Sequence, residues 1–442
     1  MPRPPSPFSR RAFLAAGATS ALAIGCSDYR GLAPFMGLED ASRYGGDPTT
    51  SGIEHIVLVM MENRSFDHLF GWMPHADGQQ AGLTYLDAAG VAHPTYPLTP
   101  DFQGCGLQDP DHSYDGARVE YDGGACDGWL RVNDIFSIGY YHRSDLAFCG
   151  KAAPAWSSFD RYFAAILGPT FPNRLYQHAA QTDRLSNTLT LSTLPTIWDR
   201  LAAAGIDGRY YFGDVPFLGL WGSKYLPIAR TLDSFFADCQ AGTLPKVAFV
   251  DGPFLSEATG TGFDDHPHND IRAGEAFLNG IYEAVTRGPG WANTLLIINF
   301  DEWGGFFDHV PPSLAPLPAS DIAVGSDGRR GFRTPTILIS PFARRSFTSH
   351  TLYDHTSVLR LIEWRWGLAP LTVRDASANN FADELDFKNP QLLAPAYDVP
   401  QVVGAPCASP AELSVLAPGA RPAPARAPWE ALMELARQHG WS

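Results

Sequence analysis

Polar side chains follow two apolar runs of this chain, and together they could bind a divalent cation. The run IVLVMM is followed directly by Glu62 and Asn63. The run TLLIINF is followed directly by Asp301 and Glu302. Carboxylate and amide oxygens suit hard cations, and two adjacent carboxylates repel each other unless a cation neutralises them. We therefore predict that these side chains hold one divalent cation, whose identity the sequence leaves open.

Each of these segments also fits a simpler interpretation. Asn63 or Ser65 could be the N-cap of a helix that opens near Arg64, with Asp67 in its first turn. The acids after the second run could form a solvated turn. Because the same polar ending follows both runs, we favour the shared metal site.

The elements that must position these residues are predicted from hydrophobic periodicity. Apolar runs that end abruptly at polar residues indicate buried parallel strands, whose carboxyl ends meet at one edge of a sheet. Strands are predicted at 53–61, 209–213, 246–251, 294–300 and 334–340, and helices at 192–205, 270–287, 353–367 and 428–440. The helix at 270–287 joins two of these strands into a β-α-β unit. The pattern predicts an α/β fold with a mostly parallel central sheet.

Composition divides the chain into consecutive parts. We interpret residues 1–26 as an export signal, 27–52 as a Gly-rich spacer, 53–385 as the main domain and 386–442 as a Pro-rich tail that ends in a short helix. Within the main domain, residues 74–160 are rich in Gly, Asp, Tyr and His and show little periodicity. Long segments of this kind are usually functional, so we expect this one to cap the site.

Overall composition limits the class of protein and its partners. The 442-residue chain is 45% hydrophobic and 18% charged, which is typical of a soluble globular protein with a large core. Its formal net charge of −15 argues against nucleic acid as a partner, because a polyanion would be repelled. An anionic phosphoester stays a candidate ligand, because a bound cation and a few histidines can reverse the local potential.

Residues 1–26 carry features of two export signals. The sequence SRRAFL resembles a twin-arginine signal, and a short apolar region follows it. The sequence LAIGC, which ends at Cys26, resembles a lipoprotein cleavage box, although Ala23 departs from the commonest pattern. We predict export by the twin-arginine route to a periplasmic, secreted or lipoprotein form. In the last case, lipidated Cys26 would attach the protein to a membrane.

Five cysteines follow this signal, namely Cys105, Cys126, Cys149, Cys239 and Cys407. None of them forms a C-x-x-C motif, which argues against a zinc-ribbon or thioredoxin-like site. Outside the cytosol one or two disulfides are expected. Cys105–Cys126 is the first candidate pair, because both residues lie in one Gly/Asp-rich region. The odd count leaves at least one free thiol.

Several blocks of the sequence resemble a bacterial phosphoesterase family. The blocks are IEHIVLVMMENRSFDHLFG (53–71), DPDHSYDG (109–116), GPTFPNRLY (168–176), LPTIWDRLAAAG (194–205), DDHPHNDIRAGE (264–275), WANTLLIINFDEWGGFFDHVPP (291–312), RTPTILISPFARR (333–345) and YDHTSVLRLIEWRWGL (353–368). They occur in the order expected for this family, which holds phosphatidylcholine-type phospholipases C and acid phosphatases and belongs to the alkaline phosphatase superfamily. The resemblance implies an alkaline-phosphatase-like three-layer sandwich with a mostly parallel central sheet and loop-rich cap insertions.

The resemblance also implies roles for single residues. Glu62, Asn63, Asp301 and Glu302 match the family's metal ligands. Thr170 matches a hydroxyl nucleophile, which a metal would activate to attack phosphorus and form a phosphothreonine intermediate. Thr170 could also be the N-cap of the helix that follows it. Because a helix N-terminus favours bound phosphate, both roles can hold together.

Histidines and one amide complete the predicted site. His112 and His266 match histidines that contact the phosphoryl group. His355 matches a site histidine, for which we expect a role at the leaving group or a phosphoryl oxygen. Asn173 and His309 are expected to contribute to substrate binding from more distant positions.

A second metal is an alternative for one pair of histidines. His266 and His268 are two residues apart, so both would face the same side of an extended chain. His268 has no clear assignment in the family, and we regard this pairing as the less favoured interpretation.

These features predict an exported, metal-dependent phosphoesterase of the phospholipase C type that acts through a threonine. An acid phosphatase acting on phosphomonoesters fits the same residues, and a non-catalytic lipoprotein that binds phospholipid or phosphate is a further alternative. The expected partner is a phosphoester, including phospholipid, and the oligomeric state is not predicted. The sequence contains no G-x-S-x-G and no H-E-x-x-H motif, so a serine hydrolase or a zincin is not favoured.

Overall fold

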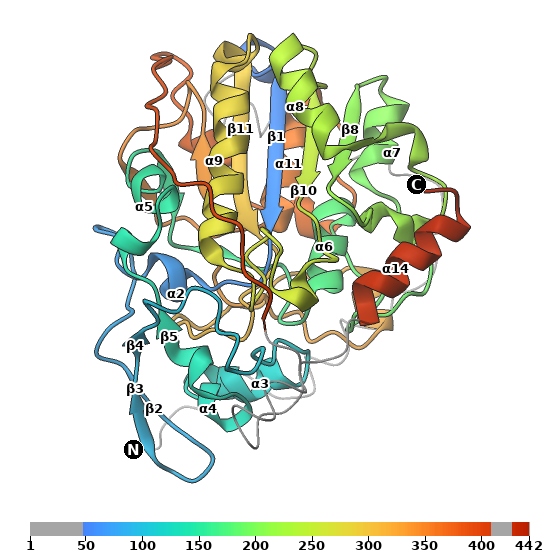
Figure 1. Ribbon diagram of the computed structural model, residues 1–442. Coiled ribbons are helices and arrows are strands. Elements are labelled where there is room, and N and C mark those ends of the chain that lie inside the picture. The colour runs from blue at the N-terminus through green and yellow to red at the C-terminus, as the bar shows by residue number, and fades with distance from the viewer. Residues whose placement is uncertain (1–46, 408–426, 442) are drawn as a thin grey trace, which may run out of the picture. The chain divides into compact units, whose positions relative to one another are not determined.

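The computed structural model describes residues 47–407 and 427–441, which are built around a mostly parallel β-sheet (Figure 1). Within these residues the sheet has eight strands in the order β13-β6-β12-β11-β1-β10-β8-β9. The strands are β1 (His55–Met61), β6 (Ser157–Phe159), β8 (Gly208–Phe212), β9 (Ala229–Thr231), β10 (Val247–Asp251), β11 (Thr294–Phe300), β12 (Ile337–Ile339) and β13 (Phe347–Ser349). β1 is parallel to both β10 and β11, whereas β12 is antiparallel to β11 and β6. The predicted mostly parallel sheet is confirmed.

Helices cover both faces of this sheet, which gives the three-layer arrangement expected from the sequence (Figure 1). One face carries α8 (Leu232–Ala241) and α9 (Ile271–Arg287), which pack against each other. The other face carries α6 (Thr170–Ala179) and α11 (His355–Trp366), which are also in contact. The predicted β-α-β unit is present, but β1 lies between its strands β10 and β11.

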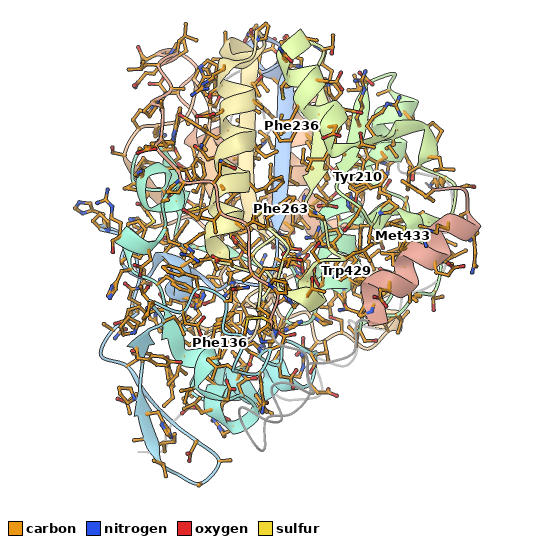
Figure 2. All side chains as sticks on the ribbon, viewed as in Figure 1. Phe136, Tyr210, Phe236, Phe263, Trp429 and Met433 are labelled. Atoms are coloured by element: carbon orange, nitrogen blue, oxygen red, sulfur yellow. A yellow bond between two sulfur atoms is a disulfide. The ribbon has the colours of Figure 1, made fainter. Side chains whose placement is uncertain are left out.

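The central strands are buried because helices cover both of their faces. All seven residues of β11 are buried, and so are six of the seven residues of β1. Strands covered on both faces need continuous apolar residues, which is the pattern of both runs. Figure 2 shows the side chains that fill the layers, with Trp429 of the C-terminal helix turned toward the body of the protein.

Side-chain caps define where several helices begin. Ser65 accepts a backbone N–H and begins α2 (Phe66–Phe70). Asp270 and Asp354 begin α9 and α11 in the same way. The helix predicted to open near residue 64 is therefore present, and its cap is Ser65. Asn63 is thus left available for another role.

Residues 74–160 form a set of short elements, most of which lie beyond the carboxyl end of β1 (Figure 1). They are β2 (Thr84–Leu86), β3 (Ala92–Pro94), β4 (Tyr96–Pro97), α3 (Gly116–Tyr121), α4 (Trp129–Val132), β5 (Gly139–Tyr140) and α5 (Cys149–Ala152). The last part of the segment differs from the prediction, because it enters the central sheet as β6. The remaining strands and α-helices of the described residues are β7 (Tyr162–Phe163), β14 (Tyr353–Asp354), α7 (Ile197–Ala203), α10 (Ala319–Ala323), α12 (Val373–Ala376) and α14 (Ala427–Gln438).

The two ends of the chain are described only in part. The export signal predicted at 1–26, with its cleavage box at Cys26, lies outside the described residues, as does most of the predicted spacer. The start of the Pro-rich tail packs against the body, where the Tyr282 hydroxyl donates to the Pro395 carbonyl at 2.6 Å. Among the helices of the described parts, none has the length and apolar character needed to cross a membrane.

Candidate active site

Glu62 and Asp301 lie side by side at the carboxyl edge of the central sheet. The register of β1 and β11 places Met61 opposite Phe300, so the next residue of each strand emerges at the same place. The Asp301 N–H donates to the Met61 carbonyl at 3.0 Å, and the Asn63 N–H donates to Asp301 Oδ1 at 3.0 Å. The structure therefore brings together the two segments from which the sequence predicts metal ligands.

Each predicted metal ligand keeps one buried oxygen without a hydrogen-bond partner among the described residues. These atoms are Glu62 Oε2, Asn63 Oδ1, Asp301 Oδ2 and Glu302 Oε1, and all of these side chains are fully buried. A buried polar atom without a partner costs free energy, so native proteins contain few of them. Oxygens of this kind are the ligands that a divalent cation takes, so the donor types at this edge fit the predicted metal.

Negative charge gathers at this edge and is only partly neutralised by the protein. Burial raises the pKa of Glu62 well above its usual range, although the Arg174 guanidinium opposes this shift. Burial and the neighbouring Asp301 carboxylate raise the pKa of Glu302 in the same way. Arg174 donates to Glu62 Oε1 at 2.8 Å and to Asp251 Oδ1 at 2.8 Å. One guanidinium cannot neutralise several carboxylates. The positive charge of a metal ion would therefore stabilise this site further.

Arg174 and Asp251 belong to this cluster, although neither was predicted from the sequence. Asp251 ends β10, which pairs with β1 on the side away from β11. The rule applied to the other two strand ends would therefore have found it. Arg174 lies one turn after Thr170 on α6, and residues four apart share a face of a helix. This spacing was the signal available for Arg174.

Thr170 is the first residue of α6, and the loop before it is clamped from within the helix. Asn173 Nδ2 donates to the Gly168 carbonyl at 2.7 Å, and Asn173 Oδ1 accepts the Ile166 N–H at 3.0 Å. The N-cap is Pro169, without a side-chain capping bond, so Thr170 does not cap the helix as the alternative interpretation required. Asn173 is fully buried and holds the loop that presents Thr170.

Thr170 lines a pocket of about 490 Å³ together with two of the predicted histidines. The described residues that line this pocket are Asp109, Pro110, Asp111, His112, Ser113, Pro169, Thr170, Ser186, Asn187, Phe254, Leu255, Glu257, His266, Pro267, His268, Pro428, Trp429 and Glu430. They belong to residues 74–160, which we call the cap, to the start of α6, to the segment between α6 and α7, to the segment after β10 and to the start of α14. The C-terminal helix therefore contributes to the wall of the candidate site.

His112 connects the pocket to the predicted metal ligands. Its Nε2 lies 3.7 Å from Glu302 Oε1 and 3.4 Å from Asn63 Nδ2. Its Nδ1 donates to the Pro110 carbonyl at 2.8 Å. His266 lies close by, with 6.1 Å between the two ring centroids. Burial lowers the pKa of His266 to about 4, so this ring is neutral near pH 7.

Comparison with known proteins assigns this chain to a family. The model of the Phosphoesterase family matches residues 53–369. The chain belongs to the phosphoesterase family. Phospholipase C B of Mycobacterium tuberculosis is 31% identical over 429 residues, which cover 78% of this chain and 81% of that protein. Non-specific phospholipase C1 of Arabidopsis thaliana is 28% identical, with coverages of 79% and 73%.

These matches confirm the resemblance found in the sequence. Hemolytic phospholipase C of Pseudomonas aeruginosa is 28% identical and covers 89% of this chain, which spans 64% of that protein. The chain is therefore a phospholipase C-like phosphoesterase, a hydrolase of phosphoric esters. Among solved structures, a protein of the alkaline phosphatase superfamily from Vibrio parahaemolyticus overlaps with a TM-score of 0.37 and 10% identity, over 88% of each chain.

His355 lies behind the segment of this phosphoesterase that carries the predicted metal ligand Asp301. Its Nε2 donates to the Asp301 backbone carbonyl at 2.6 Å, and its Nδ1 accepts the Tyr162 hydroxyl at 2.8 Å. The ring is fully buried, and both nitrogens are engaged. This placement differs from the expected contact with a leaving group or phosphoryl oxygen, because no ring nitrogen is left to face a substrate. His355 instead holds the backbone of Asp301.

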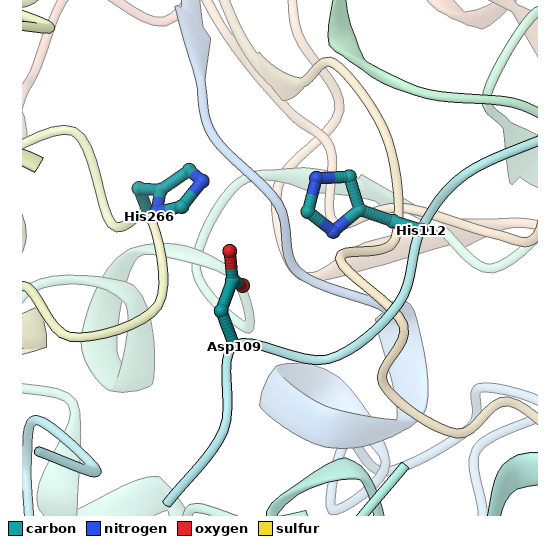
Figure 3. Close-up of side chains that lie close together, drawn as sticks. All are labelled: Asp109, His112 and His266. Atoms are coloured by element: carbon teal, nitrogen blue, oxygen red, sulfur yellow. The ribbon is translucent and has the colours of Figure 1, made fainter. Parts of the chain in front are cut away.

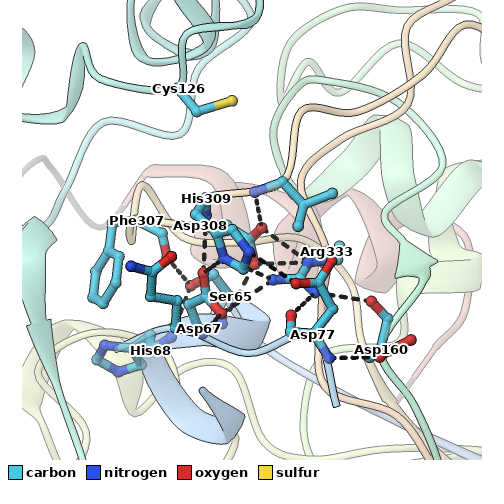
Figure 4. Close-up of polar contacts among 12 residues, drawn as sticks. Ser65, Asp67, His68, Asp77, Cys126, Asp160, Phe307, Asp308, His309 and Arg333 are labelled. Carbon is cyan, nitrogen blue, oxygen red and sulfur yellow. Dashed lines mark hydrogen bonds and ion pairs between the residues drawn. The ribbon is translucent and has the colours of Figure 1, made fainter. Parts of the chain in front are cut away.

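His309 lies in a largely buried ionic network beside α2 (Figure 4). Its Nδ1 contacts the Asp67 carboxylate, and its Nε2 lies 3.1 Å from Asp77 Oδ1. Arg333 donates to Asp308 Oδ1 at 2.9 Å and to Asp67 Oδ1 at 3.1 Å. The network ties the loop after β11 to α2 and to the start of the cap. His309 is therefore placed to support this loop of the phosphoesterase rather than to contact the substrate.

The disulfide joins Cys105 to Cys407, which corrects the Cys105–Cys126 pairing predicted from the sequence. Cys126 is a buried free thiol. At Cys407 the Pro-rich tail contacts the segment after β10, where the Cys407 N–H donates to the Thr259 carbonyl at 3.0 Å. Cysteines 302 positions apart meet because the path of the tail, and not distance along the chain, sets which thiols are neighbours.

We expect the double variant Cys105→Ser/Cys407→Ser to be less stable and less active than the wild-type protein. Loss of the cross-link should lower the free energy of unfolding by about 2–5 kcal/mol. It should also loosen the loop that leads to His112. Urea unfolding and initial rates measure both effects. A reducing agent should lower the stability and activity of the wild-type protein to those of the variant and should leave the variant unchanged. Equal stability of the wild-type protein, the reduced wild-type protein and the variant would contradict this expectation.

Proposed function

We propose that this phosphoesterase is a metal-dependent enzyme that cleaves phosphodiesters through Thr170. The observation that carries the proposal is a single pocket that Thr170 lines together with His112 and His266. His112 lies beside buried carboxylates, whose negative charge a cation would neutralise. The cation would be held by the strand-end ligands, Glu62, Asn63, Asp301 and Glu302.

In the proposed reaction, Thr170 supplies the attacking oxygen. Its Oγ forms a bond to phosphorus in line with the ester oxygen, which leaves and takes up a proton. Water then attacks the phosphothreonine, breaks its Oγ–P bond and restores the hydroxyl. Asn173 fixes the loop before Thr170 and His355 fixes the backbone of Asp301, so both act as positioning residues. A bound divalent cation would lower the pKa of the hydroxyl and offset the charge of the phosphoryl oxygens.

The lining of the pocket supports a substrate that carries a positive charge beyond its phosphate. Asp111, Glu257 and Glu430 contribute carboxyl groups, and the described lining residues include no Lys or Arg. The rings of Phe254 and Trp429 stack with 3.9 Å between centroids at the same pocket. Aromatic rings and carboxylates are groups that bind quaternary ammonium ions. A phosphodiester with a cationic head group therefore suits this pocket better than a doubly charged phosphomonoester.

A substrate panel on the purified protein tests this proposal. The probes are p-nitrophenylphosphorylcholine, its neutral analogue with carbon in place of the ammonium nitrogen, and p-nitrophenyl phosphate. We expect kcat/KM for the choline ester to exceed that for the neutral analogue by about tenfold, which corresponds to about 1.4 kcal/mol. The monoester should be slower still, and chelation of divalent cations should lower every rate.

Two other results would replace the proposal with one of the alternatives. Preference for the monoester would indicate an acid phosphatase. Absence of turnover in the cation-replete protein would indicate a protein that binds phosphate or phospholipid without cleaving it. Export by the twin-arginine route and lipidation of Cys26 stay predictions from the sequence, and the mass of the mature protein from cells tests them together.

A further inference from the structure

The hairpin formed by β2 and β3 ends in an apolar tip that is exposed to solvent. Leu86 is 55% exposed and Val91 is 54% exposed. Figure 1 shows the hairpin projecting from the body of the protein. The small apolar residues between and beside these two are exposed as well, namely Ala88, Ala89 and Ala92. Neighbouring exposed apolar side chains of this kind often mark a surface that contacts a protein or a membrane.

The polar groups of the tip are satisfied within its own turn. The Asp87 N–H donates to the Val91 carbonyl and the Gly90 N–H to the Asp87 carbonyl, both at 2.9 Å. Asp87 Oδ1 accepts the N–H groups of Ala89 at 2.9 Å and of Val91 at 2.8 Å. His93 Nε2 lies 3.0 Å from Asp87 Oδ2. Backbone groups that enter a lipid phase must keep their partners, and this turn supplies them internally.

The base of the hairpin is anchored in the cap, which fixes where the tip points. Tyr85 is buried, and its ring lies 6.1 Å from that of Phe307 between centroids. Successive side chains of a strand face opposite sides, so the burial of Tyr85 turns Leu86 outward. A two-stranded hairpin is barely stable by itself. This anchor therefore lets the tip project from the body as an ordered element.

The hairpin belongs to the same side of the protein as the pocket. β2 packs against α4, and α4 packs against α3. The loop that leads to α3 forms one wall of the pocket. Figure 3 shows two side chains of this loop, Asp109 and His112, opposite His266. A surface that the tip contacts would therefore lie beside the pocket.

The charge around the hairpin limits what that surface is. Residues 74–117 include the hairpin and this pocket wall, and they contain several aspartates but no Lys or Arg. Binding to anionic lipids depends on Lys and Arg near the membrane, so an anionic membrane does not fit. A phosphatidylcholine surface has no net charge, and its outermost groups are cations. Aspartates and an apolar tip match both properties.

We propose that the tip of the β2–β3 hairpin inserts into the surface of a zwitterionic phospholipid bilayer and holds the pocket beside the lipid head groups. The inference rests on the proposed function, because a lipid with a cationic head group is presented to the enzyme at such a surface. Binding of this kind grows with the apolar area that enters the interface. Leu86 and Val91 supply the large side chains of this area.

Sedimentation with phosphatidylcholine vesicles tests the contact. Every protein sample carries Cys26→Ser, which excludes a lipid anchor, and Thr170→Ala, so that lipid is not consumed. We expect Leu86→Ser/Val91→Ser to bind these vesicles at least about tenfold more weakly than the parent, because burial of two such side chains is worth more than this factor. With Thr170 restored, hydrolysis of vesicle lipid should fall to a similar extent, whereas hydrolysis of soluble p-nitrophenylphosphorylcholine should not change.

A matched variant removes the same kind of side chain at the other edge of the sheet. Leu392 and Leu393 are 58% and 82% exposed. They lie near the amino end of β11, since Trp291 Nε1 donates to the Leu392 carbonyl at 2.7 Å. Leu392→Ser/Leu393→Ser should bind vesicles as the parent does. Equal binding by the parent and the hairpin variant overturns the proposal.

A fluorescent probe reports insertion without removing an apolar residue. An environment-sensitive dye on Ala89→Cys should shift to the blue when phosphatidylcholine vesicles are added. The same dye on Ala241→Cys, an exposed position at the end of α8, should not shift. A dye at residue 89 that stays in water on bound protein overturns the insertion. Binding to phosphatidylglycerol vesicles alone overturns the zwitterionic partner.

Failure of the membrane contact and failure of the proposed function give different results. A protein that cleaves p-nitrophenylphosphorylcholine but binds no phosphatidylcholine vesicles disproves the membrane contact alone. A protein that binds these vesicles through the hairpin and cleaves no phosphoester disproves the function alone.

Discussion

Replacement of Thr170 by alanine is expected to abolish phosphoester hydrolysis. We expect kcat/KM for p-nitrophenylphosphorylcholine to fall by at least about 10⁴-fold, because loss of the nucleophile of a hydrolase can cost on the order of 10⁶-fold. The fold should be unaffected, since Thr170 does not cap α6 and its loop is held by Asn173. The midpoint of urea unfolding, measured beside the initial rates, checks this.

Two control variants sharpen the experiment on Thr170. Thr170→Ser keeps the hydroxyl and should retain much of the activity. Thr190→Ala removes the hydroxyl of an exposed threonine further along the chain and should leave the rates unchanged. Wild-type turnover by Thr170→Ala would remove Thr170 from the mechanism and leave the role of nucleophile unassigned.

Replacement of Arg174 by methionine should destabilise the protein strongly. The Arg174 side chain is 2% exposed. Its guanidinium forms ion pairs with the carboxylates of Glu62, Asp251 and, at 3.6 Å, Asp301. Removing one partner from a buried ionic cluster leaves charge uncompensated, which costs about 3–5 kcal/mol of unfolding free energy. Urea unfolding of the chelated protein measures the loss. Added divalent cation should recover part of it, because the proposed metal would share the same carboxylates.

Arg131→Met is the matched control for this loss of charge. Arg131 also pairs with two carboxylates, those of Asp122 and Asp127, but these side chains are substantially exposed. Ion pairs of this kind contribute about 0–1 kcal/mol, so the control should lose little stability. If Arg174→Met proved as stable as Arg131→Met, the carboxylates at the sheet edge would not form one charged cluster with Arg174.

The strand ends show how far a local pattern could predict this site. Apolar residues that continue to Met61 and to Phe300 indicated two buried strands, and parallel strands end at one edge of a sheet. The meeting of Glu62 and Asp301 followed from this rule, and the structure has it. The same rule, applied to the strand that ends at Asp251, would have added a third carboxylate.

The roles of the histidines could not be predicted in the same way. The chemistry of a histidine depends on the partner that each ring nitrogen meets. His355 turns both nitrogens to neighbours behind the pocket, whereas His112 and His266 each donate from Nδ1 to a backbone carbonyl and line the pocket. No spacing in the sequence predicts that His355 meets Tyr162 and Asp301, because these partners come from other segments.

By itself, the sequence determined the long central strands and most of the long helices, and which polar residues stand at the ends of those strands. These properties depend on the periodicity of neighbouring side chains, which each segment carries within itself. Only the tertiary structure decided that Arg174 serves Glu62, that His112 lies beside Glu302 and that Cys105 pairs with Cys407. Such contacts unite positions far apart along the polymer, and their geometry is set by the packing of all layers together.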